Sequence, residues 1–180
     1  IGICTYKYPK WILGSKLPIL RWTMSYKIIQ TIYLALLGFT IGASLLAGVV
    51  GAPVVFNAND YIHGTMLTHF QMGELMSEIF RRLSYLVTFT ATAIFLFQGY
   101  NLYKKEKCKL YYIFGAIAIS TALAFSFYFI PTILELQLQG QNVTNSELFI
   151  STHKNSELIF KVFTFSSLAL FTLRLFRAQK

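Results

Sequence analysis

Long stretches without any charged residue alternate with short clusters of charge along the chain. The uncharged stretches cover residues 28–56, 83–103 and 110–134, and a fourth, 158–173, is interrupted only by Lys161. A helix needs about 20 apolar residues to cross the hydrocarbon core of a bilayer. Because backbone polar groups in lipid must be satisfied within their own segment, we expect each stretch to form a transmembrane helix.

The hydropathy pattern therefore predicts an all-α fold, a four-helix transmembrane bundle in one membrane domain over residues 24–180. The spans are expected at about 28–56, 79–103, 110–134 and 155–175. A partly helical segment should join the first two spans, and a shorter one the last two. Composition agrees, because 55% of the 180 residues are hydrophobic and only 13% are charged, against about 25% in an average soluble domain.

The distribution of basic residues predicts the orientation. Twelve lie before the first span, between the second and third, and after the fourth: Lys7, Lys10, Lys16, Arg21, Lys27, Lys104, Lys105, Lys107, Lys109, Arg174, Arg177 and Lys180. The opposite side holds four: Arg81, Arg82, Lys154 and Lys161. Lys and Arg favour the cytoplasmic side, so both termini should be cytoplasmic in a multi-pass protein of the bacterial inner membrane.

This orientation has consequences for partners and cysteines. The bilayer is the expected partner, and the basic loops are too short to form a groove for nucleic acid. Cys4 and Cys108 would both be cytoplasmic, so no disulfide is expected.

The start of the chain raises a separate hypothesis. The sequence begins with Ile1, whereas Met24 stands just before the first hydrophobic span. Residues 1–23 are then an N-terminal extension that is not part of the natural protein. The alternative is a segment on the membrane surface, with Trp11 and Trp22 as interface anchors.

Two features suggest internal organisation. Pro53 and Pro131 each lie near the outer end of a span, where a proline kinks or stops a helix, and each is followed by a polar segment and a return span. This suggests a parallel repeat of two helix pairs, although convergent spacing explains the pattern nearly as well. Gly38 and Gly42 lie four residues apart, and such pairs let helices approach closely. Packing within one bundle is favoured over a homo-oligomer formed through this face.

Three sequence pieces carry a resemblance to a known family: "LALLGFTIGASLLAGVVGAPVVF", "GELMSEIFRRLSYL" and "HKNSELIF". Together they resemble the bacterial integral membrane family called domain of unknown function 4149, over about residues 28–176. That family is similar to a eukaryotic four-span protein associated with platinum-drug resistance. It is more distantly related to copper resistance protein D and to a haem-linked protoporphyrinogen oxidase family. The resemblance implies fold and location more than activity, and residues 57–72 lie outside it.

The stretch "HGTMLTHFQMGELM" is a candidate metal site. If it is helical, Met66, His69, Met72 and Met76 share one face, whereas His63 does not. Thioether and imidazole ligands suit copper(I). The spacing is irregular, however, and methionine also packs well in apolar contacts. Structural packing is therefore favoured over a metal site.

His153 is a candidate cofactor ligand at the start of the fourth span. By helical spacing it shares a face with Ser156 and Phe160. A histidine there could bind haem, with His69 as a second axial ligand. A structural hydrogen-bonding role is favoured, and no cofactor is expected.

Charged residues near the outer span ends form the last candidate set. Arg81 and Arg82 enter the second span, and Glu157 and Lys161 lie one helical turn apart in the fourth. Charges within spans are costly and mark candidate sites, but the favourable spacing predicts that Glu157 and Lys161 pair and that the lysine extends outward to the interface.

No nucleophile–base pair, nucleotide-binding loop or zinc motif occurs in the sequence, so an enzyme is not favoured. The leading interpretation is a non-enzymatic integral membrane protein concerned with metal or small-solute tolerance. The alternative is a haem-binding redox membrane protein.

Overall fold

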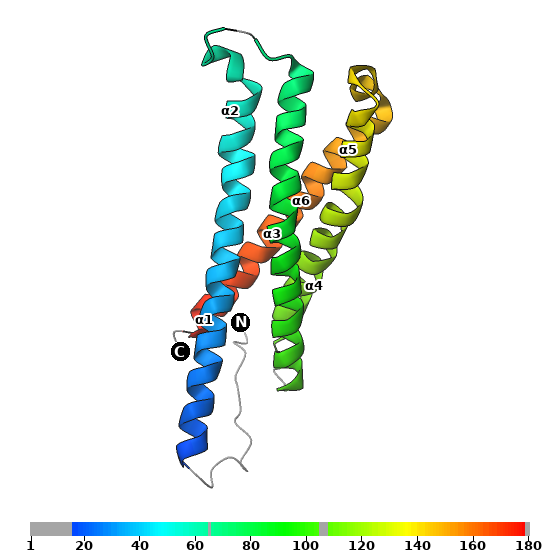
Figure 1. Cartoon of the computed structure of the whole chain (residues 1–180). Coiled ribbons are helices and arrows are strands. Elements are labelled where there is room, and N and C mark those ends of the chain that lie inside the picture. The colour runs from blue at the N-terminus through cyan, green and yellow to red at the C-terminus, as the bar shows by residue number, and fades with distance from the viewer. Residues whose placement is uncertain (1–15, 65, 105–107, 179–180) are drawn as a thin grey trace.

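The computed structural model describes residues 16–64, 66–104 and 108–178, and within these ranges every regular element is helical. The helices form four long rods (Figure 1). In chain order they are α1 (Lys16–Leu45), continued by a π-helical segment (Leu46–Gly51) and α2 (Ala52–Phe56); α3 (His69–Tyr103); α4 (Lys109–Ala124), continued by a π-helical segment (Phe125–Phe129) and α5 (Ile130–Leu138); and α6 (Glu147–Ala178).

Each rod is long and apolar enough to cross a membrane. The qualifying stretches are Tyr26–Phe56, His69–Tyr103, Lys109–Leu138 and Glu147–Phe176. They contain the four predicted spans, so the predicted all-α, four-helix transmembrane fold is confirmed. Of the hypothetical N-terminal extension, residues 1–15 lie outside the described residues and residues 16–23 belong to α1.

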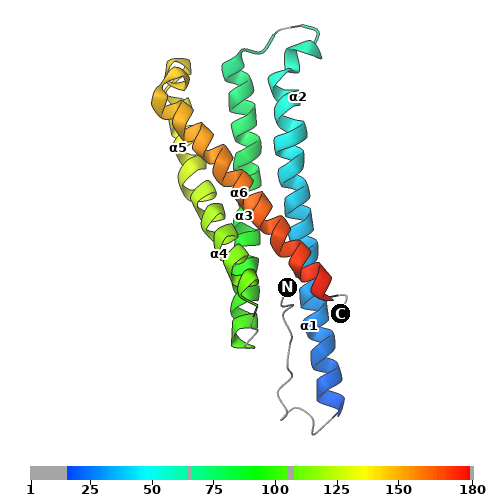
Figure 2. The same ribbon diagram turned by 180° about the vertical axis from the view of Figure 1, so that it is seen from behind.

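The four rods are not all parallel to one another. α1 and α2 rise along one side of α3, and α4 and α5 rise along the other (Figure 1). α6 returns diagonally across the bundle, from the end of α5 towards the beginning of α1 (Figure 2). Where α6 crosses α1, a Cβ atom added to Gly38 would lie 3.5 Å from the ring of Phe171. The diagonal course therefore brings α1, α3, α4 and α6 together near the end of the bundle where α1 begins and α6 ends.

Buried side chains recur every three or four residues along the rods. On the first rod they include Tyr33, Leu37, Thr40 and Ser44 of α1 and Ala47 of the π-helical segment; on α3 they include Leu83, Val87, Thr90, Ile94, Phe97 and Asn101; on α6 they include Phe160, Phe163, Ser167, Leu170 and Arg174. This spacing places the buried residues of each rod on one face, which packs against the other rods. Large apolar residues such as Phe39, Phe89 and Phe165 are exposed on the outside, as the lipid-facing surface of a bundle requires.

Both prolines of the described spans follow a π-helical segment. Pro53 comes two residues after the segment that ends at Gly51, and Pro131 two residues after the segment that ends at Phe129. Proline has no N–H and its ring crowds the carbonyl one turn earlier. A wider turn accommodates both effects, so each rod continues past its proline for a further short helix.

The two halves of the chain match at a constant separation of 78 residues. Tyr33, Leu37, Thr40, Ser44 and Ala47 on α1 correspond to the buried residues Tyr111, Gly115, Ala118, Ala122 and Phe125. The same separation relates Pro53 to Pro131 and the helix-capping residues Thr68 and Ser146. Since α1 and α4 run in the same direction (Figure 1), the predicted parallel repeat agrees with the packing as well as with the sequence.

The two connections at the far end contain short helical turns, as predicted. The first includes a 3₁₀ turn, Ala58–Asp60, and is closed by reciprocal hydrogen bonds between the Asn59 side chain and the backbone of Leu67. The second includes a 3₁₀ turn, Gln141–Asn145, after Gly140, whose φ of +98° favours glycine.

Candidate functional site

A buried arginine occupies the end of the bundle where α1 begins and α6 ends. Arg174 of α6 is 1% exposed. Its guanidinium carbon lies 3.8 Å from the ring centre of Tyr111 on α4 and 5.1 Å from that of Phe97 on α3. Cation–π attraction of this kind is strongest when the cation is desolvated. Because charge within a membrane span is costly, a buried arginine there is a candidate functional residue.

Aromatic and amide side chains from the other helices complete this group. Tyr33 of α1 stacks on Phe97 with ring centres 4.2 Å apart, and the Tyr26 hydroxyl donates a hydrogen bond to Asn101 Oδ1 at 3.2 Å. We call Tyr26, Tyr33, Phe97, Asn101, Tyr111 and Arg174 the Arg174 cluster. Every one of the four rods contributes to it, so the cluster depends on the correct assembly of the whole bundle.

Small residues make room for the polar groups beside the cluster. The Gln98 side chain donates a hydrogen bond to the backbone carbonyl of Tyr111. A Cβ atom added to Gly115 would lie 1.5 Å from Gln98 Nε2. Glycine at position 115 is therefore needed for Gln98 to reach its acceptor.

A layer of hydroxyl groups lies deeper in the bundle. Thr40 of α1 and Thr90 of α3 are both fully buried, and their hydroxyl oxygens are 2.7 Å apart. Ser44 and Ser167 are also buried, and within the described part of the chain their hydroxyl groups have no hydrogen-bond partner. We call these four residues the hydroxyl layer.

The hydroxyl layer and the Arg174 cluster lie on the same helix faces. Thr40 follows Tyr33 by seven residues on α1, Thr90 precedes Phe97 by seven on α3, and Ser167 precedes Arg174 by seven on α6. Seven residues correspond to about 10 Å along a helix. The core thus contains a column in which two groups of polar residues, the hydroxyl layer and the Arg174 cluster, are separated by the buried apolar residues Leu37, Ile94 and Leu170.

The candidate methionines and His69 do not form one group. Thr68 caps α3 through reciprocal hydrogen bonds with Gln71, so the helix begins at His69. Met66 lies before it, 71% exposed, and does not share a helix face with the others. Met72 and Met76 are 4% and 3% exposed in the core, whereas the exposed His69 ring lies 5.3 Å from the ring of Phe56.

His153 lies on the surface of α6, with its ring parallel to that of Phe149 at 6.0 Å. Ser156 and Phe160, one and two turns further along the same helix, are buried. The Ser156 hydroxyl donates to the His153 backbone carbonyl at 2.7 Å. Within the described residues, no three His, Cys, Asp or Glu side chains are grouped as metal ligands would be.

The charged candidates form two separate ion-paired groups. The Glu78 carboxylate accepts hydrogen bonds from Arg81 Nε at 2.6 Å and from Arg81 Nη2 at 2.8 Å. It also accepts one from Arg82 Nε at 2.8 Å. Lys161 Nζ lies 2.6 Å from Glu157 Oε1, which confirms the predicted pairing. All five side chains are at least 39% exposed.

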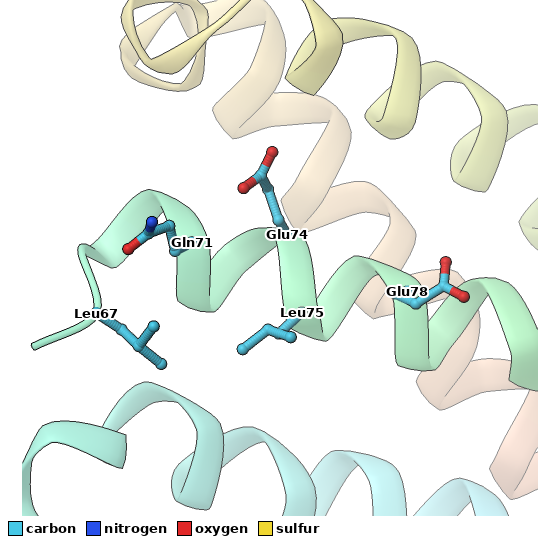
Figure 3. A pocket seen from close by; sticks show the side chains of 5 residues that line it. All are labelled: Leu67, Gln71, Glu74, Leu75 and Glu78. Atoms are coloured by element: carbon cyan, nitrogen blue, oxygen red, sulfur yellow. The ribbon is translucent and has the colours of Figure 1, made fainter. Parts of the chain in front are cut away.

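A shallow depression of about 350 Å³ lies beside the beginning of α3, lined by Leu67, Gln71, Glu74, Leu75 and Glu78. Figure 3 shows Leu67 and Leu75 on the side that faces α2, with the carboxylate of Glu74 pointing away from them. The polar side chains that line this depression do not point towards a common centre, as they would in a binding site.

The small-residue face has an internal role. Gly38 packs against Phe171 of the same chain. A Cβ added to Gly42 would have no neighbour within 4 Å. A homo-oligomer formed through Gly38 and Gly42 stays a prediction. Of these two glycines, Gly42 alone has open space at an added Cβ and could contact a second copy of the chain.

Cys108, just before α4, is 3% exposed and disulfide-bonded. The expectation that the chain forms no disulfide is therefore wrong. It rested on a cytoplasmic location, where thiols are kept reduced. The orientation of the termini stays a prediction.

Sequence reasoning missed the Arg174 cluster. Arg174 was counted among the basic residues that flank the fourth span. Its spacing from Phe163, Ser167 and Leu170 places it on the buried face of α6, and this periodicity was the available signal.

These features define a multi-pass integral membrane protein built as a four-helix bundle. Residues 35–142 match the family described as "Domain of unknown function (DUF4149)", and the chain belongs to that family. The matched range includes residues 57–72, which lie outside the resemblance that the three sequence pieces carry. It ends before α6 begins at Glu147. No curated protein and no solved structure matches the chain.

Proposed function

We propose that this chain is a non-enzymatic integral membrane protein that provides tolerance to a metal ion or another small polar solute. The observation that carries the proposal is the presence of two buried polar groups in this column, the hydroxyl layer and the Arg174 cluster. In a purely structural bundle, apolar residues fill such positions at no cost. Polar groups at this depth are expensive, and they mark the paths and sites of polar solutes in membrane proteins.

The hydroxyl layer supports this reading. An unsatisfied buried polar group costs about 1–3 kcal/mol, and Ser44 and Ser167 each carry such a hydroxyl among the described residues. A passing or bound polar solute gives both hydroxyls a partner.

The proposed location is the bacterial inner membrane, with both termini in the cytoplasm. The twelve-to-four division of basic residues supports this orientation. Fusing a fluorescent protein that matures only in the cytoplasm to Lys180 tests it. Fluorescence is the expected result, and a dark fusion that becomes active as a periplasmic reporter contradicts the orientation.

Complementation tests the function. Cells that lack the protein are challenged with a panel of metal salts and small polar solutes, with the wild type or a variant supplied in trans. We expect wild type to restore growth against at least one solute and Ser44→Ala/Ser167→Ala to fail at equal abundance. The control is Thr172→Val, since Thr172 is a half-buried residue of α6 whose hydroxyl already donates to the Leu168 carbonyl. Full complementation by the double variant, or no solute that distinguishes the strains, overturns the proposal.

A further inference from the structure

A groove on the lipid-facing surface lies between α3 and the π-helical segment Phe125–Phe129. It has a volume of about 380 Å³ and is lined by Ser84, Tyr85, Thr88, Phe89, Thr92, Ser126 and Phe127. Its aromatic walls are open to the surroundings, because Tyr85 and Phe89 are each 64% exposed and Phe127 is 68% exposed. The groove lies within the apolar span Leu83 to Tyr103, so it opens to the bilayer interior.

The serine and threonine hydroxyl groups on the floor of the groove already donate to backbone carbonyls. Ser84, Thr88 and Thr92 each donate to a backbone carbonyl within α3, at 2.7, 2.8 and 2.9 Å. Ser126 donates across the groove to the Ser84 carbonyl at 3.3 Å. With its donors satisfied in this way, the floor of the groove suits an apolar chain.

A basic group stands at one end of the groove. Arg81 Nη1 donates a hydrogen bond to the hydroxyl of Tyr85 at 3.0 Å, and Tyr85 lines the groove. Arg81 and Arg82 share a single carboxylate, that of Glu78. The group therefore carries a net charge of about +1, with Arg82 77% exposed, so it attracts an anionic group.

The dimensions also fit one kind of occupant. Arg81, Tyr85, Phe89 and Thr92 lie on one face of α3, and the helix rises about 16 Å over the eleven steps from Arg81 to Thr92. Half of a hydrocarbon core about 30 Å thick is 15 Å. A headgroup at the arginines therefore places an acyl chain along the groove with its end near the bilayer midplane.

We propose that this surface is a binding site for an anionic phospholipid. Its phosphate lies at Arg81 and Arg82, and one acyl chain occupies the groove between Tyr85, Phe89 and Phe127. The site is independent of the polar column and of the solute-tolerance function proposed above. It is located in the leaflet that contains the beginning of α3.

The test is retention of added lipid by the purified full chain in native mass spectrometry. The probes are phosphatidylglycerol and phosphatidylcholine with identical acyl chains. Attraction to anionic lipid amounts to about fivefold in affinity per net basic charge, so we expect about fivefold preference for phosphatidylglycerol. Equal retention of the two lipids overturns the proposal.

Three substitutions locate the site. Arg82→Gln should abolish the preference, whereas Glu78→Gln, which removes the shared carboxylate, should increase it about fivefold. Lys154→Gln is the matched control, because Lys154 is an exposed basic residue of α6 that does not line the groove, and it should leave the preference unchanged. A loss of preference in the control equal to that in Arg82→Gln contradicts the location.

A final variant tests the acyl chain. Thr92→Trp fills the inner end of the groove and should reduce retention of both lipids to a similar extent, while the ratio between them persists. A melting profile like that of wild type shows that the variant is folded. Unchanged retention by a folded Thr92→Trp protein excludes the groove as the acyl site.

Discussion

The guanidinium carbon of Arg174 lies 3.8 Å from the centre of the Tyr111 ring, so that a charge on α6 is held against the face of an aromatic residue on α4. Phe97 of α3 lies on the same guanidinium at 5.1 Å, and Tyr33 of α1 stacks on Phe97. One cation thus connects all four rods at the end of the bundle where α1 begins and α6 ends.

The first prediction concerns this contact. A desolvated cation–π pair contributes about 2 kcal/mol, so replacing either partner should destabilise the bundle. We expect Arg174→Met and Tyr111→Leu to show a coupling of about 2 kcal/mol in a double-mutant cycle. The free energy of unfolding in mixed micelles is the measurement. Tyr111→Phe keeps the ring and serves as the control, because it removes the hydroxyl that donates to the Leu173 carbonyl. Strict additivity of the two substitutions contradicts an energetic role for the contact.

The Arg174 cluster was not predicted from the sequence because it depends on the course of α6. Arg174 is 13 residues after Lys161, and a basic residue at that distance normally marks the membrane boundary. Its burial depends on α6 crossing diagonally over α4 and α1, which the hydropathy of a single span does not specify. The four spans themselves were predictable, because the need for apolar length acts on each segment separately.

The error at Met66 has a different cause. The sequence Thr68-His-Phe-Gln71 is a capping box, with a hydroxyl at the N-cap and a glutamine three residues later. It fixes the beginning of α3 at His69, and this signal was present in the sequence. The Glu157–Lys161 pair was predicted correctly because a four-residue spacing on a helix is a purely local relationship.

The second prediction concerns the hydroxyl layer. The Thr40 and Thr90 hydroxyl oxygens are 2.7 Å apart, and the Thr40 hydroxyl also donates to the Leu36 carbonyl at 2.9 Å. Thr90→Val therefore removes one buried hydrogen bond and should cost about 0.5–1.5 kcal/mol. Ser167→Ala removes a buried hydroxyl that has no partner among the described residues, and it should be neutral or stabilising. Thermal melting in detergent compares the two variants. A Ser167→Ala protein that melts as low as Thr90→Val shows instead that Ser167 has a bound partner, such as water.

The third prediction concerns the ion pair in α6. Glu157→Gln removes the partner of Lys161 and leaves that charge within the span. Glu147→Gln changes a glutamate at the beginning of the same helix, for which no ion pair is found in the described part of the chain. The first variant should therefore melt at a lower temperature than the second. Identical melting temperatures would show that Lys161 is accommodated by extending to the interface alone.

The fourth prediction concerns the methionines and His69. Met72 is 4% exposed and Met66 is 71% exposed. Truncating a core methionine costs about 2–5 kcal/mol, so Met72→Ala should destabilise the bundle while Met66→Ala has little effect. Titration of the purified protein with copper(I), with and without His69→Ala/Met72→Ala, tests the metal site. We expect no stoichiometric binding, and one tightly bound equivalent that disappears in the double variant refutes the packing interpretation. The same sample also tests for haem. We expect its absorption spectrum to show no Soret band, and a Soret band would show that haem is bound.

The last prediction uses two glycines as a matched pair. At Gly115 an added Cβ would lie 1.5 Å from the Gln98 amide nitrogen, whereas at Gly99, one residue along α3 from Gln98, it would have no neighbour within 4 Å. Alanine favours a helix over glycine by about 1 kcal/mol, so Gly99→Ala should be neutral or stabilising. Gly115→Ala must displace Gln98 from the Tyr111 carbonyl and leave buried polar groups unsatisfied, at about 1–3 kcal/mol. Unfolding free energies of the two variants give the comparison. Adding Gln98→Ala to the Gly115→Ala variant should recover part of the lost unfolding free energy, because it removes the clash. A further decrease in unfolding free energy would show that Gly115 does not serve to accommodate Gln98.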